Sequence, residues 1–211
     1  MIKVVDIIIR LLGDLIKPNK DTRNIVFLGC KESGKTTMWR FLKDELKDQG
    51  YSATTTLECV SAFDLSVGNK TVTITDSFDG SGDNEQTSLF YYAVLSNFCK
   101  QKDAKKGNNI FIYYLINQRD VQKLERDIKA QLRKIDEVSK RVKSEHPGLN
   151  IGLAMVLTNF QKGKKINIHS IDNIVKMPFK YVAYKHIHTF DINHKKADIE
   201  KLKNDIIEGY E

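Results

Sequence analysis

The residues with the clearest chemical potential lie in one short stretch of the sequence, GCKESGKTT, from Gly29 to Thr37. Two glycines, a lysine and a hydroxyl residue follow the spacing G-x-x-x-x-G-K-S/T. Between a strand and a helix, this spacing forms a loop whose backbone N–H groups surround phosphate oxygens. The apolar run NIVFL comes directly before the stretch, and a helical pattern follows it. We therefore predict that this loop binds a polyphosphate.

The residue types within the loop have separate tasks in binding phosphate. Gly29 and Gly34 permit a backbone geometry and a close approach that a Cβ atom would hinder. Lys35 supplies a positive charge for the terminal phosphates, and the Thr36 hydroxyl can ligate Mg²⁺. The loop residues predicted to bind nucleotide are Gly29, Cys30, Lys31, Glu32, Ser33, Gly34, Lys35, Thr36 and Thr37.

A magnesium ion beside the loop needs a second protein ligand, usually a carboxylate at the end of a neighbouring strand. Asp76 closes the β-rich run TVTITD and has that position in the sequence. The alternative role for this side chain is a cap on the turn after the strand. We expect Asp76 to be the metal ligand.

The elements that would position these residues alternate between strands and helices. Buried strands are predicted at NIVFLG, NIFIYYLI, LNIGLAMVLT and KHIHTF, with helical patterns between and after them. Two further β-rich runs, LECVSAFDLSV and KTVTITD, flank Gly68 and Asn69 and predict an antiparallel hairpin. The tyrosines at 91, 92, 113 and 114 are expected to be core residues with their hydroxyls in water. This alternation predicts an α/β fold with a mostly parallel sheet and helices on both faces.

Composition limits the domain organisation and the partners. With 211 residues, of which 41% are hydrophobic, the chain suits one domain with an N-terminal extension. The three cysteines lack disulfide or zinc spacing, which favours a reducing, cytoplasmic compartment. The net charge is +7, but the lysines are spread among acidic residues, so no nucleic-acid partner is expected. No run reaches the roughly 18 apolar residues of a membrane span.

The N-terminal extension has a pattern of its own. Residues 1–20 are predicted to form an amphipathic helix and linker, and residues 21–211 the phosphate-binding domain. The charges in residues 1–17 recur at three- or four-residue steps and leave a very wide apolar face, which something must cover. A membrane interface, a groove on the same domain and another subunit all remain open as that cover.

The predicted hairpin lies between the helix that follows the phosphate loop and the strand that ends at Asp76. In this order of elements, the sequence resembles the Ras superfamily of small GTPases. The spelling GKTT and the apolar N-terminal helix are most similar to the Arf and Sar branch. The resemblance implies a Ras-like P-loop NTPase fold with a six-stranded sheet, which binds GTP or GDP with Mg²⁺ and works as a molecular switch. It also implies that Thr56, in the T-I-E-like triplet Thr56-Leu57-Glu58, ligates the metal in the triphosphate state.

Two motifs of the family are altered here. The base-reading motif is matched best by Thr158, Asn159 and Gln161, in which an amide replaces the aspartate that accepts two hydrogen bonds from guanine. Asp191 is either an alternative base contact or a helix cap. In the family's D-x-x-G, counted from Asp76, the glycine position holds Asp79. The glutamine that orients water is also missing, so we assign no catalytic residue and expect weak hydrolysis.

These observations favour a cytoplasmic, GTPase-like nucleotide switch with Mg²⁺. Regulators or effectors would bind the loops at Tyr51–Glu58 and Asp76–Gln86, and residues 1–17 would provide peripheral contact with the cytosolic face of a membrane. Two alternatives stay open. The first is an adaptor with a degenerate GTPase fold and permanent or no nucleotide, and the second is a P-loop ATPase or kinase of another lineage.

Overall fold

The structure is a computed structural model that describes residues 21–44, 58–80, 87–100, 109–160, 168–191 and 195–209. The N-terminal helix predicted over residues 1–20, the switch residue Thr56 and the base-motif residue Gln161 lie outside these ranges. Among the described helices, none combines the length and the apolar character needed to cross a bilayer. The elements in chain order are β1 (Thr22–Gly29), α2 (Lys35–Leu42), β2 (Glu58–Val60), β3 (Phe63–Val67), β4 (Lys70–Ile74), β5 (Ser77–Asp79), α3 (Thr87–Lys100), β6 (Asn109–Asn117), α4 (Val121–Glu145), β7 (Asn150–Phe160), α5 (Ile168–Val175), β8 (Ala183–Asp191) and α6 (Lys195–Glu208).

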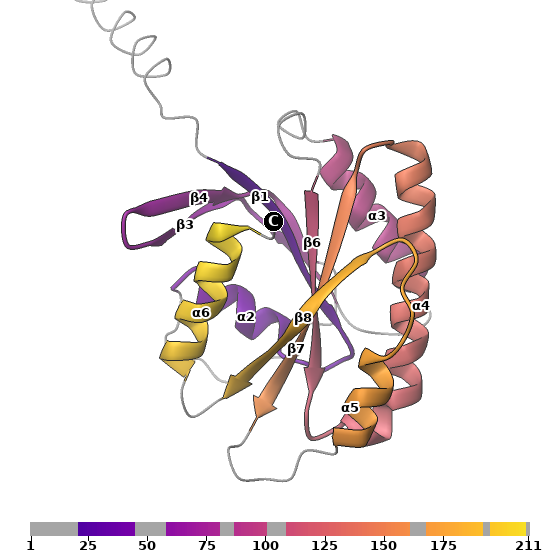
Figure 1. Ribbon diagram of the computed structural model, residues 1–211. Coiled ribbons are helices and arrows are strands. Elements are labelled where there is room, and N and C mark those ends of the chain that lie inside the picture. Colours follow the sequence, from indigo (N-terminus) through magenta and orange to yellow (C-terminus); the bar gives the residue numbers. More distant parts are fainter. Residues whose placement is uncertain are drawn as a thin grey trace, which may run out of the picture.

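Six strands form one sheet in the order β3-β4-β1-β6-β7-β8 (Figure 1). All neighbouring pairs are parallel except β3 and β4, which form an antiparallel pair at one edge. This arrangement confirms the predicted fold class, an α/β domain with a mostly parallel six-stranded sheet and one antiparallel hairpin strand. It places β1, which carries the phosphate loop at its end, in the interior of the sheet.

Helices cover both faces of the sheet because the central strands are apolar on both sides. In β6, Ile112 and Tyr114 face the cluster that includes α3, α4 and α5, while Tyr113 and Leu115 face the cluster that includes α2 and α6. This period-two alternation within a fully apolar strand is typical of a strand buried between two helical layers. Figure 1 shows α3, α4 and α5 on one side and α2 and α6 on the other.

The hairpin is longer than the two β-rich runs of the sequence suggest. Strand β2 pairs antiparallel with β5, and β3 pairs antiparallel with β4. The two ladders share one register, so residues 58–67 run opposite residues 70–79 throughout. The strand therefore resumes after its break and ends at Asp79, not at Asp76.

The interruption of the hairpin has a clear cause in hydrogen bonding. At the break, the exposed Asp76 side chain accepts a hydrogen bond from the Ala62 backbone N–H through Oδ1, at 2.7 Å. Beyond the break, the Ser77 hydroxyl donates to the Ile25 carbonyl at 2.8 Å. The Ser77 contact ties β5 to β1 and so brings the end of the hairpin next to the phosphate loop.

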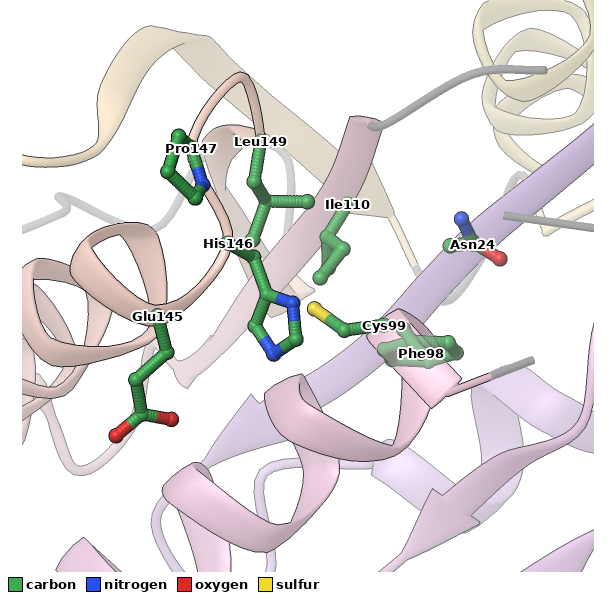
Figure 2. Close-up of a pocket in the computed structure, with 8 residues that line it drawn as sticks. All are labelled: Asn24, Phe98, Cys99, Ile110, Glu145, His146, Pro147 and Leu149. Carbon is green, nitrogen blue, oxygen red and sulfur yellow. The ribbon is translucent and has the colours of Figure 1, made fainter. Parts of the chain in front are cut away.

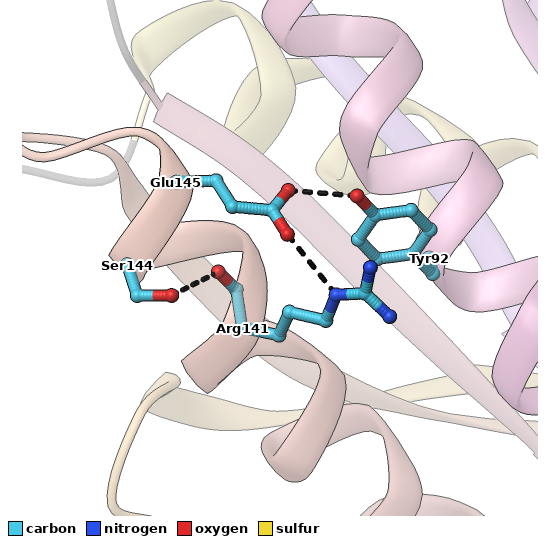
Figure 3. Close-up of polar contacts among 4 residues, drawn as sticks. All are labelled: Tyr92, Arg141, Ser144 and Glu145. Atoms are coloured by element: carbon cyan, nitrogen blue, oxygen red, sulfur yellow. Dashed lines mark hydrogen bonds and ion pairs between the residues drawn. The ribbon is translucent and has the colours of Figure 1, made fainter.

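Helices α3 and α4 pack against each other and are also linked at the surface (Figure 3). The Tyr92 hydroxyl donates to Glu145 Oε2 at 2.7 Å, and Arg141 Nε pairs with Glu145 Oε1 at 3.0 Å. The Arg141 guanidinium also lies 4.1 Å from the centre of the Tyr92 ring. Because these groups are exposed to solvent, we expect the ion pair to contribute little to stability.

Candidate phosphate-binding site

The phosphate loop joins β1 to α2, as the sequence motif predicts. Gly29 ends β1 with φ 146°, and Gly34 comes before α2 with φ 95°. A Cβ atom on Gly29 would lie 2.3 Å from the Leu115 carbonyl oxygen and 2.8 Å from Ser33 Oγ. Only glycine fits there, because β1 and β6 approach each other closely where the loop begins.

Lys35 lies inside the loop and is only 8% exposed. Its Nζ donates hydrogen bonds to the carbonyl oxygens of Gly29 at 3.0 Å and Cys30 at 2.9 Å. Burial lowers the pKa of the Lys35 ammonium, while the nearby Asp79 carboxylate acts in the opposite direction. The loop therefore concentrates one positive charge among main-chain groups at the carboxyl end of β1.

Asp79 is the carboxylate that reaches the loop. Its Oδ2 accepts a hydrogen bond from the Thr36 hydroxyl at 2.5 Å, and the residue is 3% exposed. Its other oxygen, Oδ1, is buried and has no hydrogen-bond partner among the described residues. Burial raises the pKa of Asp79, against the effects of the Thr36 hydrogen bond and the Lys35 charge. A buried carboxylate oxygen without a partner, beside a threonine hydroxyl, fits an Mg²⁺ ion, which takes oxygen ligands.

The structure places the sequence candidate, Asp76, at the break in the hairpin. Asp76 is exposed, and its Oδ1 accepts from Ala62 at the break in the hairpin. The β-rich run in the sequence predicts that the strand ends at Asp76, whereas the shared register carries it on to Asp79. The geometry thus matches the turn-cap alternative for Asp76 and gives the position beside Thr36 to Asp79.

This shift also changes how the D-x-x-G motif is counted. Starting at Asp79, the chain reads Asp79-Gly80-Ser81-Gly82, which matches the D-x-x-G motif. The residue that follows it is Asp83, so the glutamine position holds a carboxylate. The motif itself was the available signal for Asp79, and it was missed because the β-rich run ended at Asp76.

The ends of β6 and β7 hold the other side of the loop. The Thr158 hydroxyl donates to the Ser33 carbonyl at 2.8 Å, and Asn117 Nδ2 donates to the Glu32 carbonyl at 3.3 Å. Thr158 is the first residue of the predicted base motif. Asn117 follows no motif in the sequence and was not predicted. These contacts fix the loop from the side where the base motif begins.

The remaining predicted residues divide by exposure. Within the loop, Ser33 is buried, Cys30, Gly34 and Thr36 are half-buried, and Lys31, Glu32 and Thr37 are exposed. Asn159 lies in β7 and Asp191 ends β8, and the structure describes only the backbone of these two residues. The structure therefore brings together Lys35, Thr36 and Thr158 around the loop.

A separate cavity of 260 Å³ lies at the opposite end of the sheet (Figure 2). Asn24 near the start of β1, Ile110 near the start of β6, and His146 just after α4 line it. The phosphate loop follows the carboxyl end of β1, so the two sites lie at opposite ends of the same strand. No loop residue lines this cavity.

The sheet order and the loop between β1 and α2 define an α/β fold with a mostly parallel six-stranded sheet and a P-loop sequence after its first strand. No family model matches the chain, and no curated protein matches it in sequence. Among solved structures, the chain is similar to Methanosarcina barkeri Roco2 RocCORdC bound to GDP, with a TM-score of 0.49 and 13% identity. The match covers 89% of this chain and 50% of the Roco2 chain, so this chain spans about half the length of that protein.

Proposed function

We propose that the chain binds a nucleoside di- or triphosphate with Mg²⁺ and works as a nucleotide-dependent switch, with GTP and GDP as its ligands. The observation that carries this proposal is the contact of the Thr36 hydroxyl with the buried Asp79 carboxylate beside Lys35. An ammonium, a hydroxyl and a carboxylate at the N-terminus of one helix match the needs of a magnesium–phosphate complex.

In this proposal, Thr36 and Asp79 hold the metal, and Asp79 replaces the Asp76 of the sequence analysis. When bound, Mg²⁺ would neutralise phosphate charge at this end of the loop. The unpartnered Asp79 Oδ1 supports the assignment, because an isolated buried carboxylate oxygen is costly and a cation would offset that cost. Thr56 remains a proposed third ligand that is added only in the triphosphate state.

Phosphate binding would depend on the main chain from Cys30 to Thr37 and on Lys35. The Lys35 ammonium already points into the loop, where it donates to the Gly29 and Cys30 carbonyls. We propose that phosphate oxygens take over part of this hydrogen bonding. The lysine would then enter the complex without a large change of position, which reduces the conformational cost of binding.

Base recognition is proposed for Thr158, Asn159 and Gln161. The Thr158 hydroxyl supports this placement, since it fixes the Ser33 carbonyl and so joins the end of β7 to the loop. Gln161 offers one acceptor and one donor where the family's aspartate offers two acceptors. We propose guanine as the preferred base. Because Gln161 offers only one acceptor, the selectivity for guanine should be weaker than a carboxylate would give.

The switching part of the proposal rests on the segments next to the site. Asp79 ends β5, and the segment after it carries Gly82, the last residue of the D-x-x-G motif, followed by Asp83. With a carboxylate in place of the water-orienting glutamine, hydrolysis is proposed to be slow without a partner. Effectors or regulators would bind the loops at 51–58 and 76–86 in the cytoplasm, with residues 1–17 as a peripheral membrane contact.

The missing glutamine also favours a second candidate, an adaptor that keeps the fold but does not cycle. Thermal unfolding in the presence of GTP, GDP or ATP, each with Mg²⁺ or with EDTA, separates these functions. A Mg²⁺-dependent rise in Tm with guanine nucleotides and a smaller one with ATP would support the proposal. Equal rises with GTP and ATP would favour a P-loop ATPase or kinase, and no rise with any nucleotide would favour the adaptor.

A further inference from the structure

A chain of hydrogen bonds leads from the phosphate loop into the core between the sheet and two helices. Cys30 Sγ lies 3.7 Å from the Tyr114 hydroxyl, and that hydroxyl donates to Gln131 Oε1 at 2.7 Å. The Tyr91 hydroxyl reaches the same Gln131 oxygen at 3.4 Å. We call Cys30, Tyr114, Gln131 and Tyr91 the core relay.

The direction of the hydrogen bonds in the core relay follows from the single proton of each hydroxyl. Tyr114 donates its proton to Gln131, so it can only accept from the Cys30 thiol. Burial raises the pKa of the Cys30 thiol and the pKa of both tyrosines, which keeps all three groups protonated at neutral pH. The thiol is therefore the donor that begins the core relay.

The core relay spans four separate elements of the fold. Cys30 follows β1 in the loop, Tyr114 lies on β6, Gln131 on α4 and Tyr91 on α3. Helix α3 is the next described element after Asp79, the carboxylate that contacts Thr36. The core relay thus connects the start of the phosphate loop with the helix that follows the proposed metal ligand.

The surroundings of the core relay are apolar, which makes its polar groups conspicuous. Gln131 is 2% exposed, and Tyr114 and Tyr91 belong to the cluster formed by the apolar side chains of β1, β6, α3 and α4. Polar groups in such a core cost free energy unless they are hydrogen-bonded. Leucine and phenylalanine would fill the same space without this requirement.

We propose that Tyr114 and Gln131 are positioning residues that hold Cys30, and with it the start of the phosphate loop, in the conformation that binds nucleotide. The Cys30 carbonyl is one of the two main-chain acceptors of Lys35. A shift of Cys30 would therefore displace a hydrogen-bond acceptor that holds the Lys35 ammonium in place. Neither residue lies in the phosphate loop itself. The inference rests on the proposed nucleotide binding, but the loop's conformation can be measured without nucleotide.

The experiment compares three variants that each remove one tyrosine hydroxyl and keep the ring. Tyr114→Phe breaks the contact with Cys30, Tyr91→Phe removes a second donor to Gln131, and Tyr92→Phe removes the surface bond to Glu145. Two readouts are taken for each variant. They are the Kd for fluorescent GDP with Mg²⁺, and the amide hydrogen exchange of residues 29–37 in the nucleotide-free protein.

Tyr114→Phe is expected to raise the Kd about fivefold, the factor that one net hydrogen bond represents, and to speed exchange in the loop. Tyr91→Phe should change both readouts by less than about twofold, as it spares the bond that reaches Cys30. Tyr92→Phe should leave both unchanged. The inference is overturned if Tyr114→Phe behaves like Tyr92→Phe, or if Tyr91→Phe loosens the loop as much as Tyr114→Phe does.

A second pair of variants covers the case in which Tyr114→Phe does not fold. Cys30→Ser keeps a donor toward Tyr114 and should preserve slow exchange in the loop, whereas Cys30→Ala removes the donor and should speed exchange. Equal exchange in these two variants would contradict the core relay. If the wild-type protein bound no GDP, the proposed function would fail, while the exchange rates would still decide the inference.

Discussion

The Thr36 hydroxyl donates a hydrogen bond of 2.5 Å to the Asp79 carboxylate, although the two residues are 43 positions apart in the chain. Thr36 lies in the first turn of α2, and Asp79 ends the strand that closes the hairpin. The contact joins the phosphate loop to the segment that follows the hairpin. A change in what the Thr36 hydroxyl binds would therefore alter its hydrogen bond to Asp79, and through Asp79 the position of the segment after the hairpin.

The stability of the metal-free protein should depend on Asp79 and on pH. Burial raises the pKa of Asp79, so the folded protein favours the protonated carboxyl group more than the unfolded chain does. This contribution to stability is fully present below the pKa of the unfolded state. It is lost as the pH rises through the pKa of the folded state. In EDTA at neutral pH, Asp79→Asn should therefore raise Tm, by about 2–4 °C if the cost is near 1 kcal/mol. Thermal unfolding between acidic and neutral pH measures the difference, which should shrink in acid. A lower Tm for Asp79→Asn at neutral pH would contradict the argument.

Lys35 and Lys31 belong to the same phosphate-binding motif and carry the same charge, so alanine variants of the two compare a buried lysine with an exposed one. Lys35 is buried and donates to two loop carbonyls, whereas Lys31 is exposed. Lys35→Ala should weaken GDP binding by about 10- to 100-fold, because it removes a charged hydrogen-bond donor aimed at the phosphates. Lys31→Ala should change the Kd by less than about threefold, since an exposed charge is screened by solvent. Titration of fluorescent GDP gives both values, and equal losses would show that only the net charge of the loop matters.

Two glycines with positive φ should differ in their tolerance of a methyl group. Gly29→Ala would put Cβ against the Leu115 carbonyl, whereas Gly68→Ala in the hairpin turn meets no atom within 4 Å. We expect Gly68→Ala to cost about 1 kcal/mol from backbone strain and Gly29→Ala more than about 3 kcal/mol. Urea unfolding measures both costs. Comparable values for the two variants would mean that β1 and β6 can separate at the loop.

The sequence predicted the fold well because its strands are long and apolar on both faces. The runs that become β1, β6 and β7 contain few polar residues, and such runs admit few arrangements other than a central parallel sheet. The phosphate loop was predicted for a different reason, because its geometry depends on local spacing alone. Both features can be read without knowing which strands pair.

The proposed metal ligand, Asp79, was harder to predict because strand pairing decides its position. Asp76 ends a visible β-rich run, and Ser77-Phe78-Asp79 is too short to indicate a strand by itself. Only the pairing of β5 with β2 continues the strand to Asp79. The expectation of solvated tyrosine hydroxyls was wrong for Tyr91 and Tyr114, whose hydroxyls reach Gln131, and held for Tyr92, whose bond to Glu145 is exposed.

Thr158 offers a test of how the base side supports the loop. Thr158→Val keeps the shape of the side chain and removes the hydroxyl that donates to Ser33, while Thr158→Ser keeps the hydroxyl. The valine variant should bind GDP about fivefold more weakly, the scale of one net hydrogen bond, and the serine variant should bind like the wild type. Titration of fluorescent GDP distinguishes them. Equal Kd values for the valine and serine variants would show that the Thr158 hydroxyl does not support nucleotide binding by the loop.

The central claim, that Asp79 and not Asp76 supports Mg²⁺ beside the loop, is tested most directly by the Mg²⁺ dependence of GDP binding in Asp79→Asn and Asp76→Asn. Each variant exchanges one carboxylate for an amide in the same arm of the hairpin. In the wild type and in Asp76→Asn, adding Mg²⁺ should lower the Kd for GDP. Asp79→Asn should bind GDP equally with Mg²⁺ and with EDTA. Loss of the Mg²⁺ effect in Asp76→Asn, with the effect intact in Asp79→Asn, would contradict the claim.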